Sequence, residues 1–401
     1  MHHFKLRKYQ SDIANRGLNI LSARKVLILN MEVRCGKTLT SLEIGKNYKN
    51  VLFVTKKKAI SSIEDDYKMG SYTFPITIIN YESLHKVEGK FDLVIADESH
   101  SLAAFPKPSN RTKALKKLVT GHLILMTGTL IPESNSQIFH QLWVSQHSPF
   151  PHSNFYKWFQ EYGVPKLLRT SYGMSKCYKT SQWMLIKPLI EPILITYTQK
   201  ESGFKSEIKE TIIHVPTKTN DIIRRLKRDL IIEGKDEVLL ADTAVKLMQK
   251  VHQLASGTVK FESGNRMVLD HSKANYIRDN FKGKKLAIFY KFTAELEAIK
   301  SVLNVTQDIR EFDNGGKDLH IALQIVAGRE GTKLSSADCL IFYNIDFSAV
   351  SYFQAKDRMT TKERPVNNVY WLFSEGGIEN DIYKAVTKKK DFTLKLFNKT
   401  L

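Results

Sequence analysis

Short runs of nearly continuous apolar residues alternate with helical segments through the first third of the chain. The apolar runs are Val26–Leu29, Val51–Val54, Ile76–Ile79, Leu93–Ala96 and Leu123–Met126. Between them lie segments with a helical pattern, such as Leu39–Tyr48 and Ala59–Tyr67. Runs without polar alternation are typical of strands buried on both faces, as in a parallel sheet covered by helices. The pattern therefore predicts an α/β fold built from βαβ units.

The alternation stops near Ile138 and returns in the last third of the chain. Residues 139–192 are rich in aromatic residues and Pro, residues 193–215 have an extended character, and residues 220–256 read as a long helical region. Strand-like runs resume at Leu286–Tyr290, Ile321–Val326, Leu340–Tyr343 and Val369–Phe373. We therefore predict an α/β lobe over 1–138, a mostly helical insertion and linker over 139–265, and a second α/β lobe over 266–401.

The charge balance indicates a polyanionic partner. Among 401 residues, 61 Lys and Arg stand against 41 Asp and Glu, which gives a net charge of +20. Such an excess favours nucleic acid, because Lys and Arg release the counterions of its phosphates. Cys35, Cys177 and Cys339 stand far apart, without the spacing of a disulfide framework or a zinc site, which favours a reducing compartment. No apolar run approaches the ~18 residues that a membrane helix needs.

The stretch Met31–Thr38, which reads MEVRCGKT, ends in Gly36-Lys37-Thr38 between an apolar strand and an amphipathic helix. In a loop of this kind, backbone N–H groups at a helix N-terminus hold phosphates. Lys37 is then placed to reach the terminal phosphates of a nucleoside triphosphate, and the Thr38 hydroxyl to hold magnesium. The usual spacing has a Gly where this chain has Met31.

Two adjacent carboxylates complement this loop. Asp97 ends the apolar strand Leu93–Ala96, and Glu98 follows it. Asp97 can act as the second magnesium ligand, and Glu98 can orient and deprotonate an attacking water. Together the two motifs predict ATP hydrolysis with Mg as cofactor.

An ordered series of motifs resembles the superfamily 2 helicases and translocases, and most closely the SWI/SNF-type ATPases and their compact phage-encoded relatives. In the first lobe the matching segments are Leu6–Gln10, Met31–Thr38, Val51–Tyr67, Ile79–Leu84, the DESH box Asp97–His100 and Met126–Thr129. In the second part of the chain they are Val251–Gly257, Lys285–Tyr290, Gly328–Leu334 and Gln354–Arg358.

The resemblance implies two RecA-like lobes with ATP in the cleft between them. The catalytic residues are then Glu98, Asp97, Lys37 and Arg358, the last as an arginine finger. The nucleotide-binding residues implied are Arg7, Gln10 (which reads adenine), Arg34, Cys35, Gly36, Lys37, Thr38, Gly331, Gln354 and Arg358. The residues that couple nucleotide state to the nucleic acid are His100, Thr127, Gly128 and Thr129. The residues expected to contact nucleic acid are Lys56, Lys57, Lys58, Asn80, Tyr81 and Lys333.

The chain departs from the family pattern at three positions. Arg34 replaces a Gly of the phosphate loop, Thr361 replaces a second arginine after Arg358, and Lys333 stands where the family has Asn or Leu. Arg34 and Thr361, together with Met31, keep open a nucleic-acid-binding protein with a degenerate ATP site.

The sequence thus predicts an ATP-dependent DNA translocase or helicase that acts in replication, recombination or repair. Its expected partner is duplex or branched DNA, it has no membrane partner, and it works as a monomeric motor in a bacterial or phage-infected cytoplasm. An RNA helicase is the alternative within the enzyme class, because D-E-x-H boxes occur there too.

Overall fold

The computed structural model describes residues 5–170, 173–203, 206–328, 332–361, 364–388 and 393–397. The chain divides into two compact units, Met1–Phe204 and Lys205–Leu401. In the described residues no helix is both long and apolar enough to cross a membrane.

Unit 1 contains a parallel sheet with the strand order β3-β2-β4-β5-β1-β8. Its strands are β1 (Val26–Met31), β2 (Val51–Thr55), β3 (Ile76–Asn80), β4 (Leu93–Ala96), β5 (His122–Thr127) and β8 (Leu194–Tyr197). Its helices are α1 (Lys8–Arg24), α2 (Lys37–Gly45), α3 (Ile60–Met69), α4 (Asn110–Leu118), α5 (Ile138–Trp143), α6 (Phe155–Tyr162) and α7 (Trp183–Ile190). A separate antiparallel hairpin consists of β6 (Lys166–Thr170) and β7 (Gly173–Cys177).

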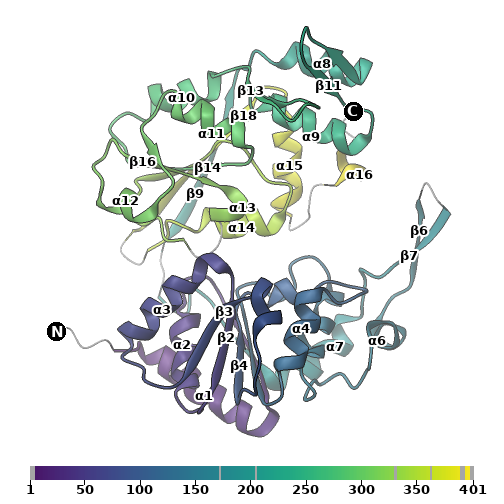
Figure 1. Ribbon diagram of the computed structural model, residues 1–401, viewed down its shortest axis with the longest axis vertical. Coiled ribbons are helices and arrows are strands. Elements are labelled where there is room, and N and C mark those ends of the chain that lie inside the picture. The colour runs from purple at the N-terminus through teal and green to yellow at the C-terminus, as the bar shows by residue number, and fades with distance from the viewer. Residues whose placement is uncertain are drawn as a thin grey trace. The chain divides into compact units, whose positions relative to one another are not determined.

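Both faces of this sheet are buried, as the unbroken apolar runs predict. Val26 and Ile28 pack with residues of α4, α5, α6 and α7 on one face, while Leu27 and Leu29 pack with α1, α2 and α3 on the other. The side chains alternate because successive residues of a strand point to opposite faces. Figure 1 shows the two helical layers on either side of β2, β3 and β4.

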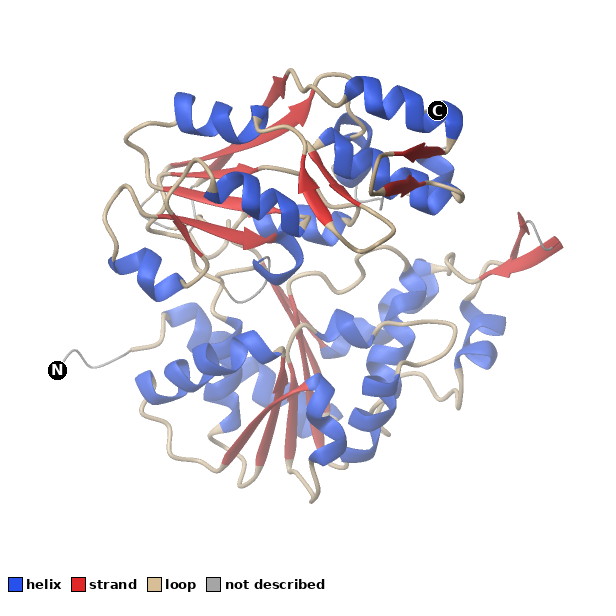
Figure 2. Ribbon diagram, turned by 45° about the horizontal axis from the view of Figure 1, so that its top comes forward, coloured by secondary structure: helices blue, strands red, loops and turns tan. Residues whose placement is uncertain are grey.

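Unit 2 repeats this architecture, with a parallel sheet in the order β15-β16-β14-β17-β18-β9. Its sheet strands are β9 (Glu207–Val215), β14 (Leu286–Tyr290), β15 (Val305–Thr306), β16 (His320–Gln324), β17 (Cys339–Phe342) and β18 (Val366–Ser374). Its helices are α8 (Asn220–Asp229), α9 (Ala244–Ala255), α10 (Ser272–Asn280), α11 (Thr293–Lys300), α12 (Ile309–Asn314), α13 (Ile325–Gly328), α14 (Ala349–Lys356), α15 (Glu379–Val386) and α16 (Leu394–Phe397). The predicted fold class, two α/β lobes built on parallel sheets, is confirmed; Figure 2 shows the strands of each sheet.

The middle of the chain is divided between the two units. Residues 139–265 do not form a separate helical insertion: β8 pairs with β1 in the first sheet, and β9 pairs with β18 in the second. The division therefore falls between Phe204 and Lys205. The two lobes share this middle segment because each recruits an edge strand from it.

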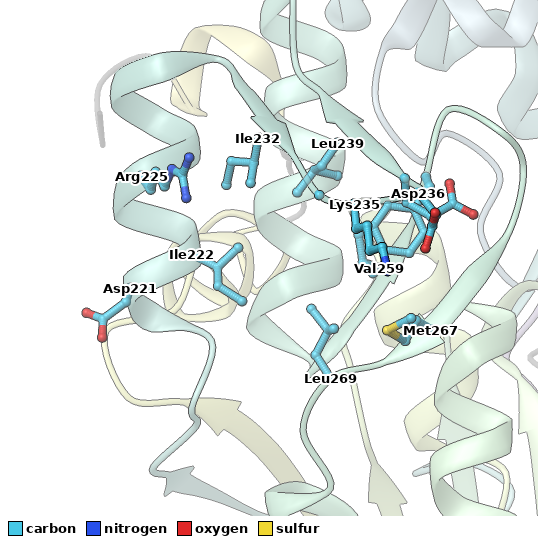
Figure 3. A pocket seen from close by; sticks show the side chains of 13 residues that line it. Asp221, Ile222, Arg225, Ile232, Lys235, Asp236, Leu239, Val259, Met267 and Leu269 are labelled. Carbon is cyan, nitrogen blue, oxygen red and sulfur yellow. The ribbon is translucent and has the colours of Figure 1, made fainter.

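The long helix predicted over 220–256 is also interrupted. The hairpin β10 (Ile231–Glu233) and β11 (Val238–Leu240) separates α8 from α9. Two β-branched residues favour a strand directly after α8, and Gly234 donates its N–H to the Glu237 carbonyl in the turn. With β12 (Thr258–Lys260) and β13 (Arg266–Val268), this hairpin and α8 line a cavity of about 530 Å³, where Figure 3 shows Ile222, Ile232 and Leu239 together.

Candidate functional site

The loop between β1 and α2, residues 32–36, lies at the carboxyl edge of the first sheet, where ligands bind in open α/β folds. Arg34 and Gly36 both have left-handed backbone, with φ of 66° and 77°. Left-handed residues in a loop are one of the ways in which successive N–H groups turn to one side, where they suit an anion. Gly36 is required for a second reason, since a Cβ there would lie 2.0 Å from Gln10 Nε2.

Lys37 opens α2, and its ammonium donates to the Met31 carbonyl at 2.8 Å and the Glu32 carbonyl at 3.3 Å. The end of β5 lies beside it, since a Cβ on Gly128 would be 3.7 Å from Lys37 Nζ. Thr38 follows in the first turn of α2 with a partly exposed side chain. Lys37 and Thr38 thus begin α2 directly after the loop, at the carboxyl edge of the sheet.

The N-terminal segment packs on this loop. The buried Gln10 accepts a hydrogen bond from the Arg7 N–H at 2.9 Å, and the Arg7 guanidinium reaches the Tyr9 hydroxyl at 3.3 Å. The same hydroxyl donates to the Cys35 carbonyl at 3.3 Å. Arg7, Gln10, Cys35 and Gly36 thus belong to one cluster, although they are far apart in sequence.

Asp97 lies directly after β4, where its N–H donates to the Val54 carbonyl. One carboxylate oxygen, Oδ2, accepts from the Thr55 hydroxyl at 2.9 Å, and the other accepts from the Glu98 N–H at 3.0 Å. Burial and the neighbouring Glu98 raise the pKa of Asp97 to about 6, against the opposing effect of Lys37. A half-buried carboxyl whose pKa is raised in this way gains from a cation, so its chemistry fits a Mg ligand.

Glu98 has left-handed backbone, with φ of 48° and ψ of 50°. Strain of this kind in a non-glycine residue is concentrated at functional sites, where surrounding structure maintains it. Burial raises the pKa of the Glu98 carboxyl, but His100, Lys37 and Lys56 outweigh that effect and lower it to about 2. The side chain is therefore ionised at neutral pH and can accept a proton from water only in a concerted step.

His100 connects this acid pair with the end of β5. Its Nδ1 lies 3.2 Å from Glu98 Oε2 and 3.3 Å from the Thr127 hydroxyl. The same hydroxyl accepts the Thr129 N–H at 3.0 Å. The predicted coupling residues His100, Thr127, Gly128 and Thr129 are thus continuous with the acid pair.

The residues predicted to contact nucleic acid have different environments. Lys57 and Lys58 are exposed just after β2, and Lys56 is close enough to lower the pKa of Glu98. Tyr81 is only 2% exposed and donates its hydroxyl to the Asp97 carbonyl at 2.6 Å, so its side chain supports the acid pair and is unavailable to a nucleic acid. Asn80 accepts the Ser83 N–H at 2.8 Å as a helix cap.

The candidate residues of unit 2 lie around the end of α14. Arg358 is 6% exposed; its Nε donates to the Gln354 carbonyl at 2.9 Å, and its Nη1 is 3.4 Å from the Thr332 carbonyl. Gln354 is buried and Lys333 is exposed. Gly331 lies outside the described residues.

Three structural partners of the site were not predicted. Thr55 ends an apolar run at the same sheet edge as Asp97, which is a signal that sequence reasoning could have used. Ser99, in the DESH box, donates to the Gln141 amide oxygen at 2.8 Å. Gln199, just after β8, donates its N–H to Glu32 Oε2 at 2.7 Å and its amide to the Val33 carbonyl at 3.0 Å. Nothing in the spacing of these last two residues indicates their partners.

Fold and site together define the class: an α/β protein whose Gly-Lys-Thr loop stands beside an acid pair at one sheet edge, as in the superfamily 2 ATPases that its motifs resemble.

No family model matches the chain. It is similar to curated proteins described as SWI/SNF-related matrix-associated actin-dependent regulator of chromatin subfamily A containing DEAD/H box 1 homolog. The one from Caenorhabditis elegans is 31% identical over 169 residues, covering 35% of this chain and 17% of that protein. The one from Drosophila melanogaster is 30% identical over 135 residues, covering 28% and 16%.

The chain thus spans about a sixth of the length of these curated relatives. Among solved structures it is similar to the Sulfolobus solfataricus SWI2/SNF2 ATPase core in complex with dsDNA. That structure has 15% sequence identity and a TM-score of 0.46, and the match covers 96% of this chain and 91% of the other. The sequence matches confirm the resemblance to SWI/SNF-type ATPases that the motifs indicated.

Proposed function

We propose that this protein is a DNA-dependent ATPase of the SWI/SNF type, which couples ATP hydrolysis to movement on duplex or branched DNA. The observation that carries the proposal is the arrangement of the acid pair. Asp97 and Glu98 leave β4 beside Lys37, whose charge affects both carboxyls, and they connect through His100 to Thr127.

In this proposal the concavity at Arg34 and Gly36 holds the phosphates of ATP with its N–H groups, and Lys37 exchanges its loop carbonyls for phosphate oxygens. Thr38 and Asp97 would hold Mg, which would neutralise charge on the phosphates. Glu98 orients the attacking water and takes its proton as the bond to phosphorus forms, while ADP leaves with the electron pair of the broken P–O bond.

We further propose that Arg358 of unit 2 stabilises the charge that develops on the transferred phosphate. For this purpose its guanidinium has to give up the carbonyl contacts with Gln354 and Thr332. An arginine in this role typically contributes ~10³–10⁵-fold in rate. The Arg358→Lys variant retains the charge but loses the planar fork, and is expected to lose most of the turnover.

A preference for DNA is supported by the net charge of +20 and by the SWI/SNF-related sequence matches. We propose replication, recombination or repair as the setting, in a bacterial or phage-infected cytoplasm, with the protein acting as a monomer.

The test measures phosphate release with duplex DNA, single-stranded DNA and RNA. We expect stimulation by duplex DNA, loss of turnover in Glu98→Gln with retained ATP binding, and no effect of Glu88→Gln, an exposed glutamate of the same unit. Stimulation by RNA alone would identify an RNA helicase. No turnover with any polynucleotide would identify a binding protein with a degenerate site.

A further inference from the structure

The β6–β7 hairpin is an exposed element that the ATP site does not explain. It forms its own two-stranded sheet, and Figures 1 and 2 both show it extending away from the body of unit 1. Leu167 and Met174 are each 62% exposed, and Leu168 is 52% exposed. Because neighbouring residues of a strand point to opposite faces, Leu167 and Leu168 leave apolar surface on both sides. Exposed apolar surface on a projecting element indicates an interaction site.

The charge of the hairpin identifies the kind of partner. From Gly163 to Ile190 the sequence contains five basic residues and no Asp or Glu: Lys166, Arg169, Lys176, Lys179 and Lys187. Lys176 pairs across the hairpin with Leu167, so positive charge and apolar surface alternate along one element. This combination fits a nucleic acid. Lysines bind its phosphates, while leucine and methionine insert between stacked bases and unstack them.

The base of the hairpin is fixed to the segment that follows β5. Gly163 and Ser181 form a bridge at this base, and the Val164 N–H donates to the Thr180 carbonyl at 2.9 Å. Asn135 donates to the Ser181 carbonyl at 3.2 Å, and the Ser134 hydroxyl donates to the Lys179 carbonyl. These anchors hold the hairpin on a buried part of unit 1.

That buried part is connected to the DESH box. Gln141 is fully buried, accepts from the Ser99 hydroxyl at 2.8 Å, and donates to the Leu130 carbonyl at 2.9 Å. Leu130 follows Thr129 directly, and Ser134 is four residues further along. Two hydrogen bonds of Gln141 thus join Ser99 of the DESH box to Leu130, at the start of the segment that leads to the hairpin base.

We propose that the β6–β7 hairpin is a second DNA contact, which wedges its exposed Leu and Met side chains into the junction between duplex and separated strands while Lys166 and Lys176 bind the flanking phosphates. This inference rests on the proposed DNA-dependent ATPase function. The inference adds strand separation to the proposed movement along the duplex, and it assigns strand separation to the β6–β7 hairpin.

The test uses forked DNA with 2-aminopurine at the junction, whose fluorescence rises when the base is unstacked. An apolar variant (Leu167→Ser, Leu168→Ser and Met174→Ser together) is expected to lose the fluorescence rise and to separate forked strands at least ~10-fold more slowly, while duplex-stimulated ATPase stays at the wild-type rate. The control Met69→Ser changes an apolar side chain that is 46% exposed on α3, and should behave as the wild type.

The charge variant Lys166→Ala with Lys176→Ala tests the phosphate contacts separately. The slope of log affinity for forked DNA against log salt should decrease by about 2, with no change for Lys300→Ala, an exposed lysine of unit 2.

Wild-type fluorescence and strand separation in the apolar variant would overturn the wedge, and would be the result if the hairpin served a protein partner. A wild-type protein without any DNA-stimulated ATPase would instead refute the proposed function, so the two failures are distinguishable.

Discussion

Replacing Gly36 with Ala tests whether Gln10 and the β1–α2 loop form one packed unit. Left-handed backbone costs a residue with a Cβ about 1–2 kcal/mol. The added Cβ would lie 2.0 Å from Gln10 Nε2, so the amide must move. Moving it sacrifices the hydrogen bond that Gln10 accepts from the Arg7 N–H, part of the first turn of α1. Loss of such a cap costs roughly 0.5–2 kcal/mol.

The two costs add to about 1.5–4 kcal/mol, and the smaller conformational freedom of alanine in the unfolded chain reduces this total to about 1–3 kcal/mol. In a Gln10→Ala background the Cβ meets no amide, so Gly36→Ala should cost only the backbone strain of about 1–2 kcal/mol. The Gly283→Ala variant isolates that strain in unit 2, where amide exchange of β14 reports it, because Gly283 has φ of 72° and no atom lies within 4 Å of its Cβ position.

The assay is amide hydrogen exchange of β1 and α2, which reports the free energy of opening this part of unit 1. We expect Gly36→Ala and Gln10→Ala to be coupled by about 1 kcal/mol in a double-mutant cycle. Additivity to within about 0.5 kcal/mol would refute the reasoning, because residues without contact add in this way.

Three further predictions concern polar groups of unit 1. Burial lowers the pKa of His140 from 6.5 to about 4, so stability is lost as pH falls below the unfolded value. The loss from His140 should reach about 2 kcal/mol between about pH 7.5 and about pH 5; urea titrations of His140→Asn, which retains a donor, should show a smaller decrease. Gln141→Leu should leave ATP binding intact but reduce fork unwinding per ATP hydrolysed, which parallel ATPase and unwinding assays measure. Gln199→Ala should weaken binding of a fluorescent ATP analogue several-fold, because it removes the contacts that hold Glu32 and the Val33 carbonyl in the loop. Amide hydrogen exchange at β6 should not change. Unchanged affinity for the analogue would refute a role of Gln199 in shaping the loop.

The sheets were predictable from sequence because they depend on local pattern. The predicted runs at Val26, Val51, Ile76, Leu93 and Leu123 all fall on strands of the first sheet. Continuous apolar runs have few structures open to them other than strands covered on both faces.

The middle of the chain was not predictable in the same way. Strands β8 and β9 lie close in sequence but join different sheets, and a pattern of extended residues cannot indicate which neighbour a strand chooses. The β6–β7 hairpin was missed because the described side chains of its strands are mostly exposed on both faces, so the period-2 signal that depends on burial is absent.

The site shows the same division between local and long-range information. Gly36, Lys37, Asp97 and Glu98 were recognisable as candidates because the chemistry expected of them depends on residue type and position after a strand. The left-handed backbone of Arg34 was not, since the sequence offers an arginine where glycine is usual. That departure is compatible with the loop, because the N–H groups and not the side chain shape the concavity.

Hydrogen bonds attach the β1–α2 loop to the segment that leads from unit 1 into unit 2. The Glu32 N–H donates to the Tyr197 carbonyl at 2.9 Å, Gln199 bonds to Glu32 and Val33, and Cys35 Sγ lies 3.7 Å from the Ser202 hydroxyl. Residues 197–202 are the last part of unit 1 before the boundary at Phe204. A rearrangement of the loop around a triphosphate would therefore strain the segment that leads into unit 2, whatever the arrangement of the two units. In this chain the candidate phosphate loop, residues 32–36, and residues 197–202 are joined by hydrogen bonds. Substitutions in either segment should therefore change the conformation of the other.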